Sequence, residues 1–319
     1  TAQVAGTHPV SRTFAVLRAF TDARRAWWAA GLGCAALISP ILGGGPAPVP
    51  PRGRLFIVGG GTQPEDLPPR FVALAGGPGK ARIVVVPLAS EAAQESGEEK
   101  ATQLRELGAT AYVMAPTRAE AMDPEYAHRV DSASGIWFTG GDQSRVTPVL
   151  LDTPLLAAMK ARYRAGAVIG GTSAGAAIMS DSMLTGNQRR PDSLGYYGDE
   201  FPEIARGTIE VVPGLGFLHG AIVDQHFIRR ERHNRLLSVV LERPDLIGVG
   251  VDEGTALLVE PDGAWQVLGA SAVEVIDARH GTVTGTAAPL LGAINLRLFL
   301  LPAGSRFDPQ SGRATLPEP

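Results

Sequence analysis

The sequence predicts an α/β protein with a mostly parallel sheet flanked by helices and additional antiparallel strands toward the C-terminus. From Arg54 onward, short apolar runs rich in β-branched or aromatic residues recur, and each ends in glycine, proline or a small polar residue. Helical segments separate several of these runs. Apolar strands that alternate with helices indicate a parallel sheet covered on both faces, and the active site of such a fold lies outside the carboxyl ends of its strands.

The predicted elements follow this alternation along the chain. The first strands are predicted over residues 55–58, 83–86, 111–114, 136–139 and 167–169, and helices over residues 92–107 and 155–164. Further strands are predicted over residues 221–223, 247–251, 255–259, 265–268, 273–276 and 294–300. The close spacing of the later strands predicts antiparallel pairing. The tail after Ala303 is predicted to be loop.

Length, charge and cysteine content limit the function classes. The chain has 319 residues, and residues 53–319 suit one large domain with a buried core. The formal net charge of −3 argues against nucleic acid or an acidic membrane surface as partner. Cys34 is the only cysteine, so disulfides within the domain, a cysteine nucleophile and a thiolate metal site are excluded. We expect an enzyme without a cofactor or a metal ion.

Residues 1–52 differ from the rest of the chain. Arg24 and Arg25 precede an uncharged run over residues 26–42, and residues 43–51 form a linker of mainly glycine and proline. This order is typical of a secretory leader, and the apolar run is short for a transmembrane span. We therefore expect export to the periplasm or the extracellular space, without stable membrane insertion once the leader is removed. The alternative is a disordered extension on a cytoplasmic protein.

Residues 171–175 form the pattern G-x-S-x-G between a predicted strand and a predicted helix. Small residues at these positions allow a sharp turn that exposes the hydroxyl of Ser173, as in a nucleophile elbow. The amide of Ala174 would then point toward the place where an oxyanion forms. Ser173 is the predicted nucleophile.

A serine nucleophile needs a base and a group that orients the base. His226 follows an apolar strand directly, and Asp252 and Glu253 follow the next strand. From the residues alone, these two carboxylates are nearly equal candidates for the acid. The chain order serine, histidine, acid differs from that of α/β-hydrolases, which argues against an ordinary lipase or esterase.

Four segments together resemble peptidase family S51, the cyanophycinase family within the class I glutamine amidotransferase-like superfamily. They are residues 138–143, residues 170–177, residues 224–227 with the arginines that follow, and residues 250–256. The resemblance implies a flavodoxin-like sheet and a homodimer. It also implies hydrolysis of cyanophycin, a poly-aspartate that carries arginine on each β-carboxyl, to β-Asp-Arg dipeptides.

The same resemblance implies the roles of individual residues. It makes Ser173, His226 and Glu253 the catalytic triad, and the amides of Gly141 and Ala174 the oxyanion donors. It also assigns six side chains with forked cations or hydrogen-bonding groups to the substrate: Gln143, Asp224, Gln225, Arg230, Arg232 and Arg235.

One segment departs from the family pattern. Residues 181–207 form a longer connection between the predicted nucleophile and base, and we expect it to rim the active site, with a plain surface insertion as the alternative. The segment bears on substrate more than on chemistry. A related aspartyl or isoaspartyl dipeptidase is therefore the first alternative function, and a non-catalytic amidotransferase-like binding protein is the second.

Overall fold

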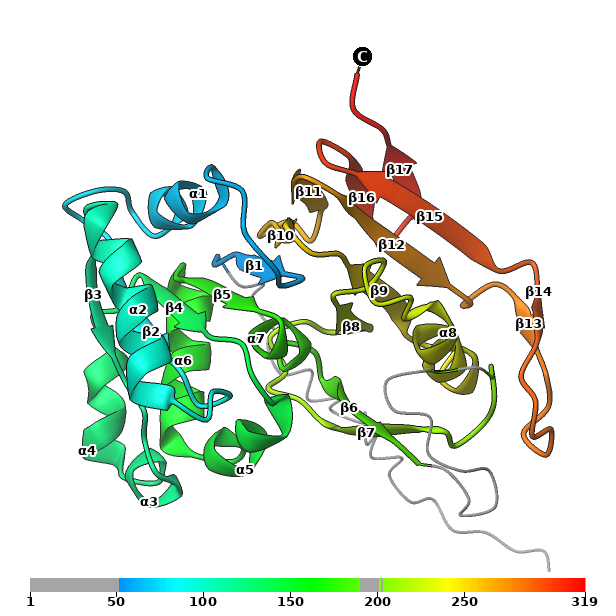
Figure 1. The fold of residues 1–319 in the computed structure, drawn as a ribbon, viewed down its shortest axis with the longest axis horizontal. Helices are drawn as coiled ribbons and strands as arrows, with labels where there is room; N and C mark the ends of the chain where they lie inside the picture. Colours follow the sequence, from blue (N-terminus) through cyan, green and yellow to red (C-terminus); the bar gives the residue numbers. More distant parts are fainter. Residues whose placement is uncertain (1–51, 190–200, 202, 319) are drawn as a thin grey trace, which may run out of the picture. The chain divides into compact units, whose positions relative to one another are not determined.

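The computed structural model describes residues 52–189, 201 and 203–318 (Figure 1). The predicted leader, apart from Arg52, lies outside the described residues, and so do residues 190–200 and 202 of the long connection.

The larger sheet is built around the predicted parallel strands (Figure 1). Its strand order is β17-β16-β11-β10-β1-β5-β4-β2-β3. The half from β1 to β3 is parallel, because its neighbouring strands pair parallel in each case. These strands are β1 (Leu55–Val58), β2 (Arg82–Val86), β3 (Thr110–Val113), β4 (Gly135–Phe138) and β5 (Val168–Thr172). Four antiparallel strands extend the sheet beyond β1: β10 (Thr255–Val259), β11 (Trp265–Gly269), β16 (Arg306–Asp308) and β17 (Arg313–Thr315).

The tail after Ala303 is not a loop, and that prediction is wrong. β16 pairs with β11, and β17 pairs with β16. β16 is held to the sheet by Phe307, which is buried. Its ring centroid lies 5.3 Å from that of Trp265 and 5.1 Å from that of Phe299. A single aromatic residue in a polar tail is too weak a pattern to predict a strand from sequence.

A second sheet has the order β15-β12-β9-β8. β8 and β9 pair parallel, whereas β9 with β12 and β12 with β15 pair antiparallel. β9 and β10 are consecutive in the chain yet belong to different sheets, so residues 252–254 cross from one sheet to the other. The strands are β8 (Ala221–Gln225), β9 (Ile247–Val251), β12 (Ala272–Asp277) and β15 (Arg297–Pro302).

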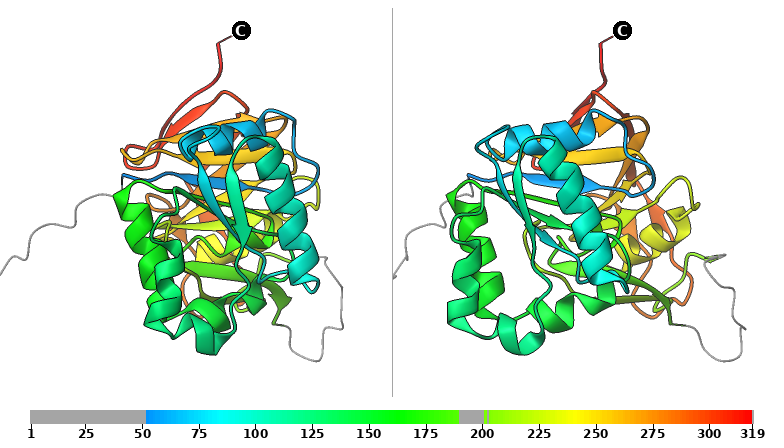
Figure 2. Two further views of the ribbon diagram at one scale, coloured as in Figure 1. Left: turned by 90° about the vertical axis from the view of Figure 1, so that its left-hand side faces the viewer. Right: turned by 60° about the vertical axis from the view of Figure 1, so that its left-hand side comes forward.

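Helices cover both faces of the parallel strands (Figure 2). Side chains of α1 and α2 share one core cluster with residues of β1, β2 and β4, and side chains of α6 and α7 share another with the opposite face. The second sheet joins the cluster of α6 and α7 through one face and packs against α8 through the other. The longer helices are α1 (Leu67–Leu74), α2 (Ala93–Glu106), α6 (Pro154–Ala165) and α8 (His233–Glu242). None of the helices in the described ranges is long and apolar enough to cross a membrane.

Short elements complete the fold. The one-turn helices are α3 (Arg118–Ala121), α4 (Pro124–Ala127), α5 (Thr147–Leu150) and α7 (Ala174–Ala177), with 3-10 turns at His128–Val130 and Gln143–Arg145. Two separate hairpins are formed by β6 (Ser182–Gln188) with β7 (Ile209–Pro213) and by β13 (Thr282–Val283) with β14 (Ala293–Ile294). The long connection after the predicted nucleophile therefore begins as a strand.

Candidate active site

Ser173 lies at the carboxyl end of β5, in a turn that leads directly into α7. Its backbone has φ 54° and ψ −112°, a strained conformation for a residue with a side chain, and its N–H donates to Val58 O at 2.9 Å. The neighbouring glycines make this turn possible. A Cβ at Gly171 would lie 2.4 Å from Gly175 O, and a Cβ at Gly175 would lie 2.4 Å from Phe138 O.

His226 lies at the carboxyl end of β8 and faces Ser173. Its Nε2 is 2.8 Å from Ser173 Oγ, and its Nδ1 is 2.6 Å from Glu253 Oε1. An ionised carboxylate only accepts hydrogen bonds, so Nδ1–H donates to Glu253 and Nε2 is left to accept the serine proton. Strands of the two different sheets thus bring the three predicted triad residues together.

Burial decides the protonation state of His226. The ring is mostly buried, and this desolvation lowers its pKa below the ordinary value of 6.5. The hydrogen bond to Glu253 raises the pKa, whereas the charges of Arg230 and Arg232 lower it. The net direction is downward, so the imidazole is neutral and able to accept a proton at neutral pH.

Asp252, the other candidate acid, accepts hydrogen bonds from a backbone N–H and a hydroxyl group nearby. Its Oδ1 accepts the Arg229 N–H at 2.9 Å, and its Oδ2 accepts the Ser271 hydroxyl at 2.7 Å. One oxygen therefore holds the turn after His226, and the other holds the turn between β11 and β12. The sequence left the choice between these two carboxylates open. The geometry favours Glu253 as the acid.

Sequence reasoning missed the glycines at residues 59–61, which follow β1 and support the histidine and the glutamate. The N–H of His226, itself at φ 49°, donates to Gly59 O at 2.7 Å. A Cβ at Gly60 would lie 2.3 Å from His226 Cε1, and a Cβ at Gly61 would lie 2.6 Å from Glu253 Oε2. Three consecutive glycines at the end of an apolar strand were the available signal, because such a run allows another side chain to approach the backbone closely.

The two predicted oxyanion donors flank Ser173. Gly141 has φ +135°, and a Cβ there would lie 2.1 Å from Ala89 O, so only glycine fits. A Cβ at Gly140 would lie 3.4 Å from Ser173 Cβ, which places this turn beside the nucleophile. Ala174 directly follows Ser173 and begins α7. Their roles as donors remain a prediction.

Five of the six predicted substrate contacts are buried and hydrogen-bonded to other protein groups. Arg235 binds Asp224 through two hydrogen bonds, one of them from Nε to Oδ2 at 2.8 Å. Arg232 Nη1 donates to Gln225 O at 2.7 Å and also to the Gln225 side chain. Gln143 Nε2 donates to the carbonyls of residues 184 and 185 in β6, each at 2.8 Å. The exposed fractions of these five side chains are all below a tenth: Gln143, Asp224, Gln225, Arg232 and Arg235.

Arg230 differs from the other five. It is exposed and makes no ion pair with any residue that the structure describes. α8 begins at His233, so Arg230 and Arg232 lie in the turn that precedes it, whereas Arg235 lies on the helix. Arg230 is close enough to His226 to lower its pKa.

Within residues 52–189, 201 and 203–318, no three histidine, cysteine, aspartate or glutamate side chains are grouped so that they could hold a metal ion.

Comparisons with known proteins agree on one family. The family model described as Peptidase family S51 matches residues 55–267. A cyanophycinase from Geminocystis herdmanii is 33% identical over 269 residues, which covers 81% of this chain and 94% of that protein. A cyanophycinase from Trichormus variabilis is 35% identical over 240 residues, which covers 72% of this chain and 76% of that protein. The crystal structure of a peptidase from an acI-B1 Actinobacterium has a TM-score of 0.58 at 22% identity, covering 82% of this chain and 98% of that one, and supports the fold.

Proposed function

The chain belongs to peptidase family S51, and from that premise we propose that it is a serine exopeptidase that hydrolyses cyanophycin to β-Asp-Arg dipeptides. The observation that carries the chemistry is the chain of contacts from Ser173 Oγ through His226 to Glu253, at 2.8 and 2.6 Å. These distances lie within hydrogen-bond reach for a nucleophile, its base and the group that orients the base.

In the proposed mechanism, His226 Nε2 takes the hydroxyl proton as Ser173 Oγ attacks the peptide carbonyl. Glu253 holds the imidazole in the required tautomer and stabilises its charged form. The amides of Ala174 and Gly141 donate to the developing oxyanion. The leaving amine takes the proton from His226, and water, activated by the same base, then cleaves the acyl-enzyme.

The proposed substrate is supported by the relatives and by one side chain of this chain. The curated relatives in the comparison are cyanophycinases. Arg230 is an exposed guanidinium close to the catalytic base, and it has no ion pair among the described residues. A free guanidinium at this place suits a substrate whose backbone presents repeated carboxylates.

One observation favours the alternative of an aspartyl or isoaspartyl dipeptidase. The long connection after α7 begins with β6, and the carbonyls of residues 184 and 185 in that strand occupy the amide of Gln143. Because β6 then occupies a side chain that was predicted to bind substrate, fewer contacts remain for a long polymer. A shorter substrate, which needs fewer contacts, would suit such a site.

Export and homodimer formation belong to the proposal as well. They rest on the composition of residues 1–52 and on the family resemblance.

The decisive experiment compares substrates on the purified full chain. We expect release of β-Asp-Arg from cyanophycin, and a loss of kcat of at least ~10⁴-fold in Ser173→Ala with an unchanged melting temperature, because alanine suits the turn and only the nucleophile is lost. A fluorophosphonate probe should label the wild type and leave Ser173→Ala unlabelled.

Cleavage of α- or β-aspartyl dipeptides with no cleavage of cyanophycin would establish the alternative. A wild type that neither cleaves a substrate nor reacts with the probe would contradict the proposed chemistry.

A further inference from the structure

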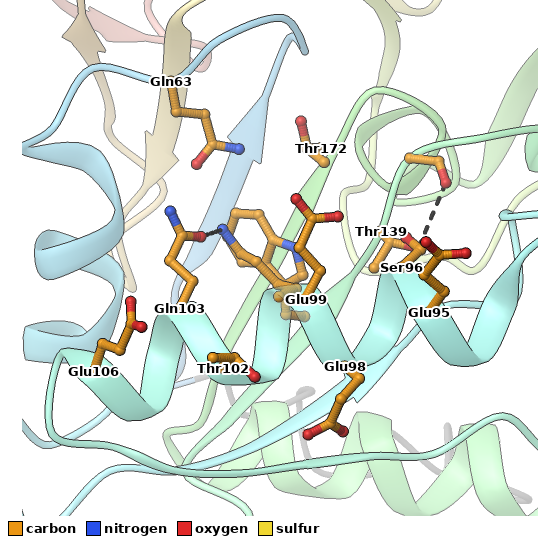
Figure 3. A pocket seen from close by; sticks show the side chains of 13 residues that line it. Gln63, Glu95, Ser96, Glu98, Glu99, Thr102, Gln103, Glu106, Thr139 and Thr172 are labelled. Atoms are coloured by element: carbon orange, nitrogen blue, oxygen red, sulfur yellow. Dashed lines mark hydrogen bonds between the residues drawn. The ribbon is translucent and has the colours of Figure 1, made fainter.

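The exposed apolar side chains of the molecule gather on its C-terminal strands. Within the residues that the structure describes, six large apolar side chains are exposed, and five of them belong to residues 290–316. Two of the five, Leu298 and Leu300, lie on β15 and are each 55% exposed. The surface beside the nucleophile turn differs, because the cavity of about 740 Å³ there is walled mainly by polar and charged side chains of α2 (Figure 3). An exposed apolar strand away from the active site marks an interaction surface.

β15 is an edge strand, because β12 is its only strand partner among the described residues (Figure 1). Ala303 N–H donates to Ser271 O at 3.1 Å and continues the register of β15 with β12, so every second residue of β15 bonds to β12. The N–H and C=O groups of Leu298 and Leu300 point the other way, toward the open edge. No hydrogen bond reaches these groups from any described residue. A groove of about 550 Å³ between β15 and β17 leaves the edge accessible.

The other edges of the two larger sheets are covered or short. At β3, the carbonyl of Ala111 accepts Arg105 Nε at 2.8 Å. At β8, the N–H of Val223 donates to Ser180 Oγ at 3.1 Å. β17 has only three residues. Natural edge strands avoid pairing through such coverage, through shortness or through charged side chains, and the four central residues of β15 have none of these protections.

The free groups of β15 match those of a second β15 that is turned about a two-fold axis. If Phe299 lies on this axis, Leu298 of each copy faces Leu300 of the other, and the two antiparallel strands form four backbone hydrogen bonds. The side chains of Leu298 and Leu300 share one face of the strand, so they pack against the same leucines of the second copy. Arg297 is the only charged residue of β15 and lies opposite Leu301 in this register, so pairing brings no like charges together.

We propose that β15 is the surface through which two copies of this chain form a dimer, joined as one continuous sheet across the two-fold axis. The inference rests on the homodimer of the proposed function and names its interface. A second copy fits this edge better than an unrelated strand does, because the two residues with free groups are two positions apart and each meets the other across the axis. The joined sheet would carry the catalytic base of each copy on its outermost strand, β8.

Sedimentation equilibrium of the full chain tests this interface, and the wild type should form a dimer. Leu298→Lys should raise the Kd of the dimer roughly a hundredfold, because each copy loses a buried leucine and gains a charge. Leu300→Pro should raise it roughly tenfold, because two of the four hydrogen bonds lose a donor that has no partner in the monomer. Met122→Lys is the matched control, since Met122 is an exposed apolar residue that follows α3, and it should leave the Kd unchanged.

Disulfide trapping tests the register. Cys34→Ser makes introduced cysteines the only ones in the chain. In that background, Leu298→Cys together with Leu300→Cys should join two copies on oxidation, because the facing Cα atoms are about 5.5 Å apart. Leu298→Cys alone should not join them, since the two copies of residue 298 are diagonal neighbours about 7–8 Å apart.

Hydrolysis of an uncharged ester, which needs only the triad, shows that each variant is folded. A dimer that Leu298→Lys and Leu300→Pro leave intact would overturn the inference and keep the homodimer. A wild type that stays monomeric would overturn both, whereas the cyanophycin assay decides the peptidase function separately. Cross-linking by Leu298→Cys alone, without any by the double variant, would reject the pairing described above.

Discussion

Two charged regions near the active site differ in how their charges are neutralised. Around β8 and α8, Arg235 and Asp224 are 2% and 1% exposed and are bound to each other. Along α2, Glu95, Glu99 and Glu106 are exposed and form no ion pair within the described residues. Charges that neutralise one another inside a protein hold the structure, whereas free charges beside a cavity are available to a ligand. Arg235, which the sequence predicts to contact substrate, belongs to the paired kind, and its role toward substrate stays a prediction.

The largest effect that tests this contrast is expected for Arg235→Ala. The variant removes two hydrogen bonds from the buried Asp224 and leaves it only the longer ion pair with Arg232 at 3.8 Å, which costs up to about 3–5 kcal/mol of the free energy of unfolding. Urea denaturation should show this loss, and any residual kcat/KM should fall equally for cyanophycin and for an uncharged ester. Unchanged stability together with a loss confined to cyanophycin would instead make Arg235 a substrate contact.

A smaller change of opposite sign, a gain in the free energy of unfolding, is expected for Lys100→Met on α2. The folded state lowers the pKa of Lys100 from 10.5 to about 8, so it penalises the charged form. A shift of this size corresponds to at most about 3 kcal/mol, which methionine would recover as added stability. The gain should be complete below pH 8 and vanish as the pH rises toward 10.5, where the lysine is neutral in both states. Denaturation at pH 7 and at pH 10.5 measures it, and a destabilised variant at pH 7 would mean that the ammonium contributes to the fold.

The smallest effect is expected for Arg230→Gln. Removing this charge should raise the pKa of His226, whose wild-type value lies below 6.5 because of burial and the nearby arginines. The activity limb, which rises with pH as His226 loses its proton, should therefore move to higher pH by a fraction of a unit, and less so in high salt because Arg230 is exposed.

The pH profile of ester hydrolysis measures this shift, and kcat/KM for cyanophycin at pH 8 should fall by about tenfold. Replacing the distant His128 should leave the limb in place. A limb that follows His128 would contradict the assignment of His226 as base.

Local patterns predicted the elements that position the nucleophile. The predicted strands over 55–58, 83–86 and 136–139 overlap β1, β2 and β4, and the helix over 92–107 differs from α2 by one residue at each end. Apolar runs with clear ends carry this information by themselves. The partition into two sheets was not predictable in the same way, because β9 and β10 are both buried five-residue strands and nothing in either run says which sheet it joins.

Long-range pairing limited the prediction of the site. His226 and the pair Asp252 and Glu253 were found because each ends an apolar strand, but only the folded geometry separates the two carboxylates. The contact between Arg235 and Asp224 joins residues on two elements, and that between Gln143 and β6 spans more than forty residues. A sequence shows that such groups are polar and does not show whether they are already paired.

The position of β1 has a consequence for when the enzyme becomes active during its synthesis. This strand lies between β5 and β10, and the glycines after it accept the N–H of His226 and the N–H of Gly254 at 2.7 and 2.9 Å. Because β10 follows Glu253 in the chain and pairs with β1, we expect the base and its acid to reach their final positions only after the ribosome has made β10, long after Ser173. Contacts so distant in sequence form late in folding. A nascent or truncated chain that ends before β10 contains Ser173, His226 and Glu253 but lacks the strand that pairs with β1 on the side away from β5, so we expect its triad to be unformed and the chain to be inactive.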